Sequence, residues 1–319
     1  MHRDCSECQI RVPSGGSVER LYEFLSGCLP PDRPVFAEMA RTGNRFYTWT
    51  PHTLYRGSEI VGNVSLMPMR VWLDSRVTDV VGIASVATAP QYRRQGVAGH
   101  MLRCALSLVD PQQIPCVLLT GLPKVYQGVG FRAVAQEYRA VRVSQLDFTS
   151  RGFDGKLLVS LDDARLPQLA RVYAEKYPNY DGKIDRDSDY WQLYVMLFNL
   201  SPKSQLLLCV RGGEMLGYAR FDQDEDRLTV CELCAEPSAV DVCEALLGLL
   251  RELAAHASVE FLSFALPPDH FAWPVLRRHD VAIEPEPPGV AREAFMVRPA
   301  PGPLRPALLR LQWSLADKF

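Results

Sequence analysis

The chain has 319 residues and a formal net charge of −2, with 47% hydrophobic and 23% charged residues, as in an ordinary globular protein. The balance of Lys+Arg 35 against Asp+Glu 37 excludes a chain-wide electrostatic grip on nucleic acid, and no apolar run reaches the ~18–20 residues of a membrane span. The start of the chain lacks a basic stretch followed by an apolar core. We therefore expect two domains of a cytoplasmic protein whose nine cysteines are reduced.

The first half of the chain predicts a helix, a hairpin, a buried strand, a long helix and a second buried strand. These elements are expected at Val18–Leu25, at His52–Arg56 with Ile60–Pro68, at Val80–Ala89, at Arg94–Val109 and at Cys116–Thr120. The hairpin turn falls at Gly57-Ser58, a usual turn sequence. The run from Val80 is apolar and β-branched, which is typical of a strand buried on both faces.

The second half repeats the same order of elements. The hairpin is expected at Leu206–Val210 with Met215–Phe221, then a strand at Leu228–Cys234, a helix at Val240–His256 and a strand at Val259–Ala265. Gly62 and Gly217 occupy the same place in the two hairpins. The repeat indicates a tandem duplication, with a first domain at 1–145, a second at 146–297 and a Pro-rich tail at 298–319 that packs back on the body.

Two cysteine pairs have the spacing of a zinc knuckle, namely Cys5 with Cys8 and Cys231 with Cys234. The second pair lies in an expected strand, where residues three apart face opposite sides and cannot close on one metal. The first pair lies in a terminal segment that is expected to fray. We therefore expect buried, small apolar thiols and no metal site.

The most informative segment is the turn between the strand that ends near Ala89 and the following helix. It reads Arg93-Arg94-Gln95-Gly96-Val97-Ala98-Gly99, and no Asp or Glu occurs from Val80 through Val109. The first turn of a helix presents unpaired N–H groups and the positive end of the helix dipole, and small residues let a phosphate approach the backbone. The pattern indicates a site for a pyrophosphate, against the plainer alternative of a solvated helix start.

This segment resembles the signature of the GNAT (N-acetyltransferase) superfamily, Q/R-x-x-G-x-G/A after a strand, which Arg93, Gly96 and Ala98 fill. The resemblance implies a mixed α/β fold, here a tandem GNAT fold with mixed central sheets flanked by helices, and acetyl-CoA as co-substrate without a metal. It also implies that the acetyl and pantetheine parts bind along the strand and the pyrophosphate binds at the turn. The implied binding residues are Val86, Ala87, Thr88, Arg93, Arg94, Gln95, Gly96, Val97, Ala98, Gly99, Gly121 and Leu122.

A second family element follows the next strand. Tyr126 with Gly130-Phe131 matches a Y-x-x-x-G-F segment whose tyrosine commonly lies beside the acetyl-CoA sulfur. The resemblance implies that Tyr126 protonates the leaving thiolate, since a phenol with a pKa near 10 is a donor at neutral pH. The plainer alternative is a packing aromatic residue.

The sequence gives a less definite candidate for the general base that takes the proton of the amine. Many GNAT enzymes carry a Glu on the strand before the motif, where this chain offers Ser85, which can order a water. The tandem arrangement, the wording from Thr88 to Gly96 and the segment at 186–191 resemble the Eis-type acetyltransferases, which use their terminal carboxylate as base. That resemblance points to the carboxylate of Phe319. A water chain is the alternative.

The second domain is expected to be degenerate, because Asp241 and Glu244 at its helix start repel a pyrophosphate. The leading interpretation is an enzyme that transfers acetyl from acetyl-CoA to a primary amine of a small molecule or of a lysine or peptide, in a ternary complex. No nucleic-acid or membrane partner is expected, and a homo-oligomer is compatible with the sequence. The alternatives are an acyl-CoA sensor without turnover and an acyltransferase of secondary metabolism with another acyl donor.

Overall fold

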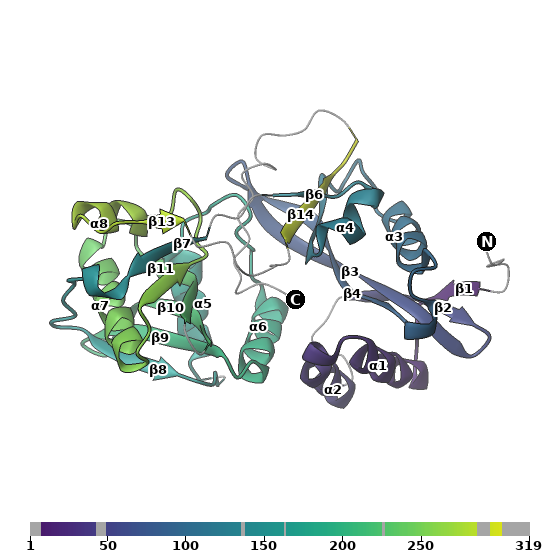
Figure 1. The fold of residues 1–319 in the computed structure, drawn as a ribbon, viewed down its shortest axis with the longest axis horizontal. Helices are drawn as coiled ribbons and strands as arrows, with labels where there is room; N and C mark the ends of the chain where they lie inside the picture. Colours follow the sequence, from purple (N-terminus) through teal and green to yellow (C-terminus); the bar gives the residue numbers. More distant parts are fainter. Residues whose placement is uncertain are drawn as a thin grey trace. The chain divides into compact units, whose positions relative to one another are not determined.

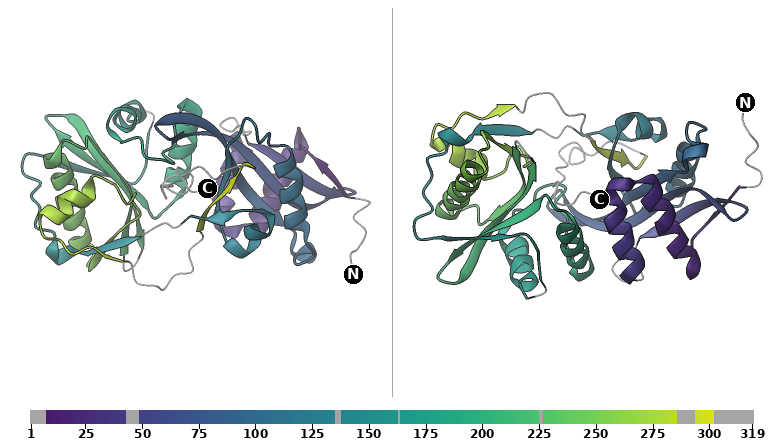
Figure 2. Two further views of the ribbon diagram at one scale, coloured as in Figure 1. Left: turned by 90° about the horizontal axis from the view of Figure 1, so that it is seen from above. Right: turned by 60° about the horizontal axis from the view of Figure 1, so that its bottom comes forward.

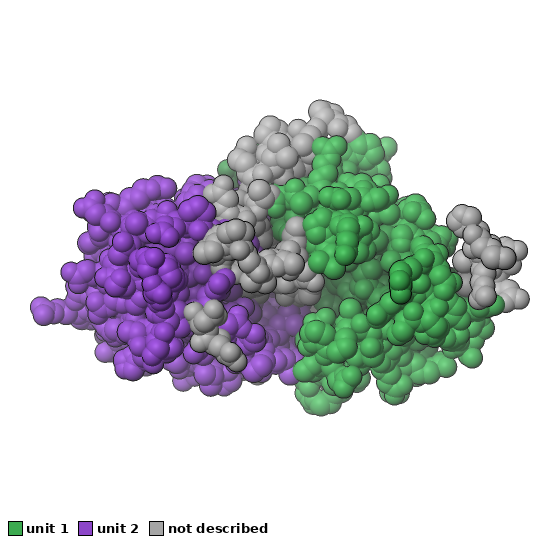
Figure 3. Space-filling view, viewed as in Figure 1, with its two compact units in different colours: residues 1–135, 292–311, 319 green, residues 136–291, 312–318 purple. Residues whose placement is uncertain are grey.

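The computed structural model describes residues 8–42, 49–134, 138–162, 164–224, 227–285 and 294–301. Its contacts divide the chain into two compact units (Figure 3), one of residues 1–135, 292–311 and 319 and one of residues 136–291 and 312–318. Each unit is built on one mixed sheet with helices on both faces (Figure 1). This confirms the expected mixed α/β architecture with two central sheets.

The sheet of the first unit has the strand order β1-β2-β3-β4-β5-β14-β6. The strands are β1 Cys8–Arg11, β2 Thr50–Arg56, β3 Glu59–Leu73, β4 Arg76–Thr88, β5 Cys116–Gly121, β6 Arg132–Ala133 and β14 Ala294–Pro299. All pairs are antiparallel except β4 with β5, which is parallel. The long helix between β4 and β5 makes this crossover possible, as parallel neighbours require.

Two helical layers cover this sheet (Figures 1 and 2). On one face lie α1 Gly16–Cys28, η1 Pro30–Asp32 and α2 Arg33–Thr42, and on the other lie α3 Val97–Ser107, α4 Pro123–Tyr126 and η3 Gln127–Val129. The core of the first layer includes Leu21, Leu25 and Ala87, and the core of the second includes Leu102, Ile83 and Met101. The short helix η2 Pro90–Tyr92 connects β4 to the turn before α3.

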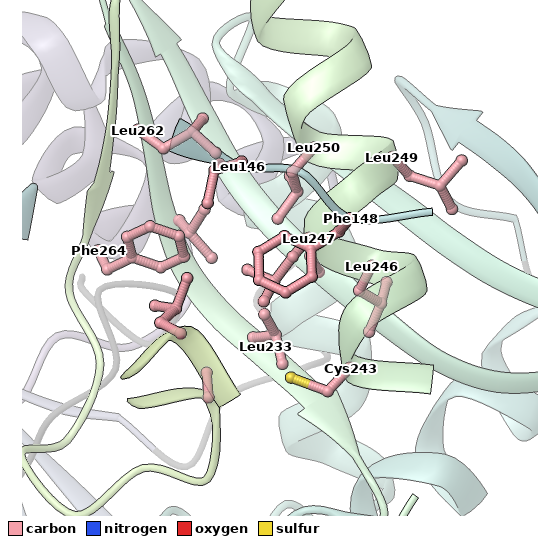
Figure 4. Close-up of a cluster of buried hydrophobic side chains, with 14 of the residues drawn as sticks. Leu146, Phe148, Leu233, Cys243, Leu246, Leu247, Leu249, Leu250, Leu262 and Phe264 are labelled. Carbon is pink, nitrogen blue, oxygen red and sulfur yellow. The ribbon is translucent and has the colours of Figure 1, made fainter. Parts of the chain in front are cut away.

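The sheet of the second unit has the order β8-β9-β10-β11-β12-β7-β13. Its strands are β7 Arg139–Arg142, β8 Asp154–Leu158, β9 Ser204–Arg211, β10 Glu214–Asp224, β11 Arg227–Ala235, β12 Phe261–Phe264 and β13 Glu284–Pro285. Its helices are η4 Val143–Gln145, α5 Leu166–Lys176, α6 Ser188–Leu200, α7 Val240–His256 and α8 Ala272–Arg278. Leucines of α7 pack on Leu233, Leu262 and Phe264 of β11 and β12 (Figure 4), so the inner face of this crossover helix is buried.

The two glycines that anchor the predicted repeat do occupy equivalent places. A Cβ on Gly62 would lie 3.0 Å from Ala87 O and 2.8 Å from Met101 Sδ. A Cβ on Gly217 would lie 2.7 Å from Cys234 O and 3.2 Å from the side chain of Leu246. In both units a glycine lets the second strand of the hairpin approach the helix that follows the next strand.

Two strands, β7 and β14, lie in a different unit from the one that the expected domain limits give them. In the first sheet β14 lies between β5 and β6, and in the second β7 lies between β12 and β13, antiparallel to both neighbours in each case. The division therefore differs from the expected limits of 1–145, 146–297 and 298–319, because β7 belongs to the second unit and β14 to the first. The tail expected to pack back on the body lies, after residue 301, outside the described residues.

The cysteines of the expected strand at 228–234 are buried thiols. Cys231 and Cys234 lie on β11 as buried thiols that form no disulfide, while Cys5 lies outside the described residues. In the described part of the chain, no group of three or more His, Cys, Asp or Glu side chains is placed to hold a metal ion. Over the same residues, no helix has the length and apolar content to cross a membrane.

Candidate active site

The parallel strands β4 and β5 separate toward their carboxyl ends. Their register pairs Val81 with Val117 and Gly82 with Leu118, whereas β4 continues to Thr88. The last residues of β4 stay paired with β3 on their other side. A splay of this kind leaves one edge of a buried strand without a neighbour, and an extended ligand can complete the ladder there.

A β-bulge lies on β4 at the start of this splay. Asn63 is paired with Ala87, but Ser65 is paired with Ala84, so one residue of β3 opposes two residues of β4. Ser85 is in the left-handed region with a φ of 50°, where a non-glycine residue is uncommon. The bulge reverses the alternation of faces: Ile83 and then Val86 face the α3 layer, and Ala87 faces the α1 layer.

The turn that follows β4 presents a series of backbone N–H groups. Arg94 has a φ of 59°, and Gly96, which precedes the first residue of α3, has a φ of 81°. His100 N donates to Gly96 O at 3.0 Å, and among the described residues no backbone carbonyl accepts from the N–H groups of 94–99. Successive amides in such alternating conformations can form an anion-binding concavity.

Three arginines surround this turn. Arg93 and Arg94 are exposed, and the Arg103 guanidinium lies beside Gly99, 3.5 Å from the position that a Cβ would take. Arg93 Nε also donates to Thr88 O at 3.2 Å, which fixes the end of β4 to the turn. The site therefore combines backbone N–H groups with positive side chains that match a diphosphate.

Glu59 holds this turn against the hairpin, although no sequence motif marks it. Tyr92 Oη donates to Glu59 Oε2 at 2.8 Å, and Gln91 Nε2 donates to Glu59 Oε1 at 2.7 Å. Glu59 is the first residue of β3, and Gly62 is paired with Thr88. That register, which a sequence pattern alone does not give, is the signal that places the hairpin turn beside the residues after β4.

Tyr126 is the last residue of α4, and its side chain lies against the end of β5. Its ring packs on the backbone of Gly121, because a Cβ on Gly121 would lie 2.5 Å from Tyr126 Cε2 and 3.3 Å from the phenol oxygen. The ring makes an edge-to-face contact with Phe131, with centroids 6.1 Å apart. Tyr126 is half-buried and the neighbouring Leu122 is exposed. Gly121 is thus the residue that makes room for the tyrosine.

Most predicted site residues meet at the carboxyl ends of β4 and β5. Ser85, Val86, Ala87 and Thr88 lie on β4, Gly121 ends β5, and Arg93, Arg94, Gln95, Gly96, Val97, Ala98 and Gly99 form the turn and the start of α3. The backbone of Ser85 forms part of the bulge, and its carbonyl accepts from Asn63. Phe319, the predicted base, lies outside the described residues.

The corresponding place in the second unit is arranged differently. After Val230, which is paired with Phe264, β11 continues to Ala235. There the buried His270 contributes Nε2 within 3.0 Å of Leu233 O, and its Nδ1 accepts from Ala272 N at 3.1 Å, which fixes Nε2 as the donor. Leu233 precedes Ala235 by two residues, as Val86 precedes Thr88, and Ala235 and Thr88 are paired with the equivalent glycines.

The helix start of the second unit also differs. The residue before α7 is Ala239, and Asp241 lies in its first turn, where Arg211 Nη1 donates to Asp241 Oδ2 at 3.0 Å. An acidic residue in the first turn satisfies the helix dipole within the protein. The second unit therefore has no glycine-containing turn at this position.

The family of the first unit follows from comparison with known proteins. Residues 10–134 match the model of the acetyltransferase (GNAT) domain family. The first unit is a GNAT acetyltransferase domain. The match covers the splay, the turn and Tyr126, so the residues described above lie within the GNAT domain. No curated protein matches the sequence of the chain.

Solved structures show the same fold over nearly the whole chain. A GCN5-related N-acetyltransferase from Anabaena variabilis is 16% identical, with a TM-score of 0.69 over 92% of this chain and 73% of that one. Eis1 from Mycobacterium abscessus is 15% identical, with a TM-score of 0.64 over 92% and 73%. A tandem GNAT protein from the clavulanic acid biosynthesis pathway is 12% identical, with a TM-score of 0.51 over 94% and 100%. The chain thus has the tandem GNAT fold.

Proposed function

We propose that the first unit binds acetyl-CoA and transfers its acetyl group to a primary amine of a small molecule or of a lysine or peptide, in a ternary complex. The observation that carries this proposal is the splay between β4 and β5, which has the bulge at Ser85 on one side and Tyr126 on the other. A thioester arm extended along β4 brings its carbonyl to the bulge and its sulfur toward the phenol.

The turn before α3 supplies the diphosphate site of this proposal. The N–H groups of 94–99 and the guanidinium groups of Arg93, Arg94 and Arg103 would hold the pyrophosphate, since fixed amides and cations stabilise a doubly charged group better than water-exposed side chains alone. Gln91 and Tyr92 donate to both oxygens of Glu59, which ties its carboxylate to the residues before the turn.

The transfer step follows from the geometry of the splay. The amine nitrogen attacks the thioester carbon, the C–S bond breaks, and the phenol of Tyr126 gives its proton to the leaving thiolate. The nitrogen loses one proton as the amide forms; a water chain takes up this proton and returns one to the Tyr126 phenolate. A backbone N–H of Val86 or Ala87 polarises the carbonyl as negative charge develops on its oxygen. The amine must be neutral when it attacks, so the rate is expected to rise with pH toward the pKa of the amine.

We propose further that the second unit binds no acyl-CoA. The imidazole of His270 occupies the strand edge at Leu233 that an extended arm would need, and Asp241 lies where a pyrophosphate would bind. The second unit is therefore a degenerate copy of the GNAT domain, consistent with one catalytic site in each chain.

Release of free thiol from acetyl-CoA, measured against a panel of amines that includes aminoglycosides and lysine peptides, tests this function. Amine-dependent release that disappears in the Gly96→Glu variant is the expected result. Saturable binding of acetyl-CoA without thiol release would instead favour a sensor. Mass spectrometry of copurified CoA thioesters would identify a donor other than acetyl, as a role in secondary metabolism requires.

A further inference from the structure

A buried polar network lies under the bulge of β4. Asn63 Nδ2 donates to Ser85 O at 3.0 Å and to Ser65 Oγ at 3.1 Å. Asn63 Oδ1 accepts from Thr53 Oγ1 at 2.9 Å. Thr53 and Asn63 are fully buried, and Ser65 is nearly so. The side-chain amide thus uses both donors and its acceptor within the sheet.

Burial of an amide costs free energy unless every polar group is paired, so the presence of a polar side chain at this buried position needs an explanation. Asn63 is paired with Ala87, which packs in the apolar layer under α1 and α2. An apolar residue at 63 would suit that layer, but it would leave the Ser85 carbonyl without this donor. The Asn63 amide therefore supplies the donor that the Ser85 carbonyl of the bulge accepts.

We infer that Asn63 is a positioning residue for acetyl transfer, an inference that rests on the proposed function. By holding the Ser85 carbonyl, Asn63 fixes the peptide between Ser85 and Val86, and this peptide carries the N–H group of Val86. The direction of the Val86 N–H group toward the thioester carbonyl depends on that peptide. Thr53 and Ser65 in turn fix the orientation of the Asn63 amide.

The second unit supplies a natural comparison. Tyr218 is paired with Cys234 as Asn63 is paired with Ala87, and both follow the equivalent glycines. Tyr218 Oη donates to the Glu232 side chain at 2.5 Å, which also pairs with the buried Arg186. The bulge of β11 falls at Cys231. At this position the first unit, which carries the proposed acyl-CoA site, thus has a side chain that donates to a bulge carbonyl. In the second unit Tyr218 donates to a carboxylate instead.

The test is a kinetic comparison of four proteins, namely wild type, Asn63→Leu, Thr53→Val and Tyr218→Phe. Asn63→Leu keeps the branching at Cγ with a somewhat larger side chain and removes the donor to Ser85, and it is expected to lower kcat roughly 10- to 100-fold, as loss of alignment at an oxyanion site does. The KM for acetyl-CoA is expected to stay within about threefold. Thr53→Val, which removes one of the two bonds that orient the Asn63 amide, is expected to lower kcat by less than Asn63→Leu does. Tyr218→Phe, which changes the equivalent position of the second unit, is expected to keep kcat within about threefold.

A spectroscopic measurement separates positioning from stability. The carbonyl stretch of acetyl-CoA labelled with ¹³C at the thioester is expected to move to lower frequency on binding to wild type and to move less in Asn63→Leu. If Asn63→Leu does not fold, Asn63→Asp replaces the donor by an acceptor at nearly the same size and takes its place. Wild-type kcat and a wild-type carbonyl shift in the folded variant would overturn the inference, even with a lower melting temperature.

The outcome is distinguishable from failure of the proposed function. If wild type binds acetyl-CoA but transfers nothing to any amine, the transferase proposal fails, and the carbonyl shift alone decides whether Asn63 positions the bulge. If wild type turns over and Asn63→Leu equals it in rate and in carbonyl shift, the transferase proposal stands and the role of Asn63 fails.

Discussion

The two units share one architecture but differ at the place where a ligand would bind. In the first unit β4 is paired with β5 only as far as Gly82, Tyr126 packs on Gly121 at the end of β5, and a glycine precedes α3. In the second unit His270 bonds to the equivalent edge, and Asp241 lies in the first turn of α7. The shared fold alone therefore does not form a ligand site. A few side chains decide in which unit a ligand can reach the strand edge and the helix start.

The largest expected effect comes from the turn before α3. Gly96→Glu places a side chain at a φ of 81° and a carboxylate among the N–H groups that would hold the pyrophosphate. The variant is expected to bind CoA at least about 100-fold more weakly, a loss of roughly 3 kcal/mol. Titration calorimetry measures this loss. The matched variant Ala239→Glu, before α7, is expected to bind like wild type, and equal losses in the two variants would contradict the assigned site.

The next effect concerns the phenol at the end of β5. Tyr126→Phe keeps the ring on Gly121 and removes the proton donor, so kcat is expected to fall roughly 10- to 100-fold, while the dissociation constant of CoA changes less than about twofold. Steady-state kinetics and a binding titration measure both quantities. An unchanged rate would mean that another group protonates the thiolate.

The sequence predicted the strands and helices that carry this contrast. The apolar runs and the glycines at 62 and 217 correctly gave the hairpins, the buried strands and the helices after them, because these patterns follow from local periodicity. The exchange of β7 and β14 was missed, since strand partners far apart in sequence are set by the whole sheet. Glu59, Asn63 and His270 were missed for the same reason: each acts through a register or a turn that no local pattern shows.

The third effect concerns the second unit, where His270 bonds to the strand edge, and the pH dependence of its free energy of unfolding. Burial lowers the pKa of His270 to about 3, so between pH 6.5 and 3 the unfolded histidine binds a proton that the folded one does not. The free energy of unfolding of the second unit is therefore expected to fall as pH falls from 6.5, by roughly 1.5 to 2 kcal/mol at pH 5. Amide hydrogen exchange in β11 measures it.

His270→Gln serves as the control for this measurement. Glutamine keeps a side-chain donor for Leu233 O but does not titrate, so this part of the pH dependence in β11 is expected to disappear. The same slope in the variant would mean that the acid sensitivity comes from another group.

The smallest expected effect concerns the contact between the hairpin and the turn. Glu59→Ala removes the acceptors of Gln91 and Tyr92, so the turn loses part of its order before binding, and CoA affinity is expected to fall about 3- to 10-fold. Glu214→Ala is the matched control, because Glu214 begins β10 as Glu59 begins β3 and contacts Arg171. An equal fall in CoA affinity with Glu214→Ala would show that the effect of Glu59→Ala is not specific to the first unit.

The number of CoA molecules bound by each chain tests the central claim most directly. Isothermal titration of the wild-type protein with CoA is expected to give one site per chain, and the Gly96→Glu variant is expected to give none. Two sites in the wild type would show that His270 and Asp241 do not close the second unit. No site in the wild type, or one site that survives in Gly96→Glu, would contradict the assignment of the first unit as the acyl-CoA site.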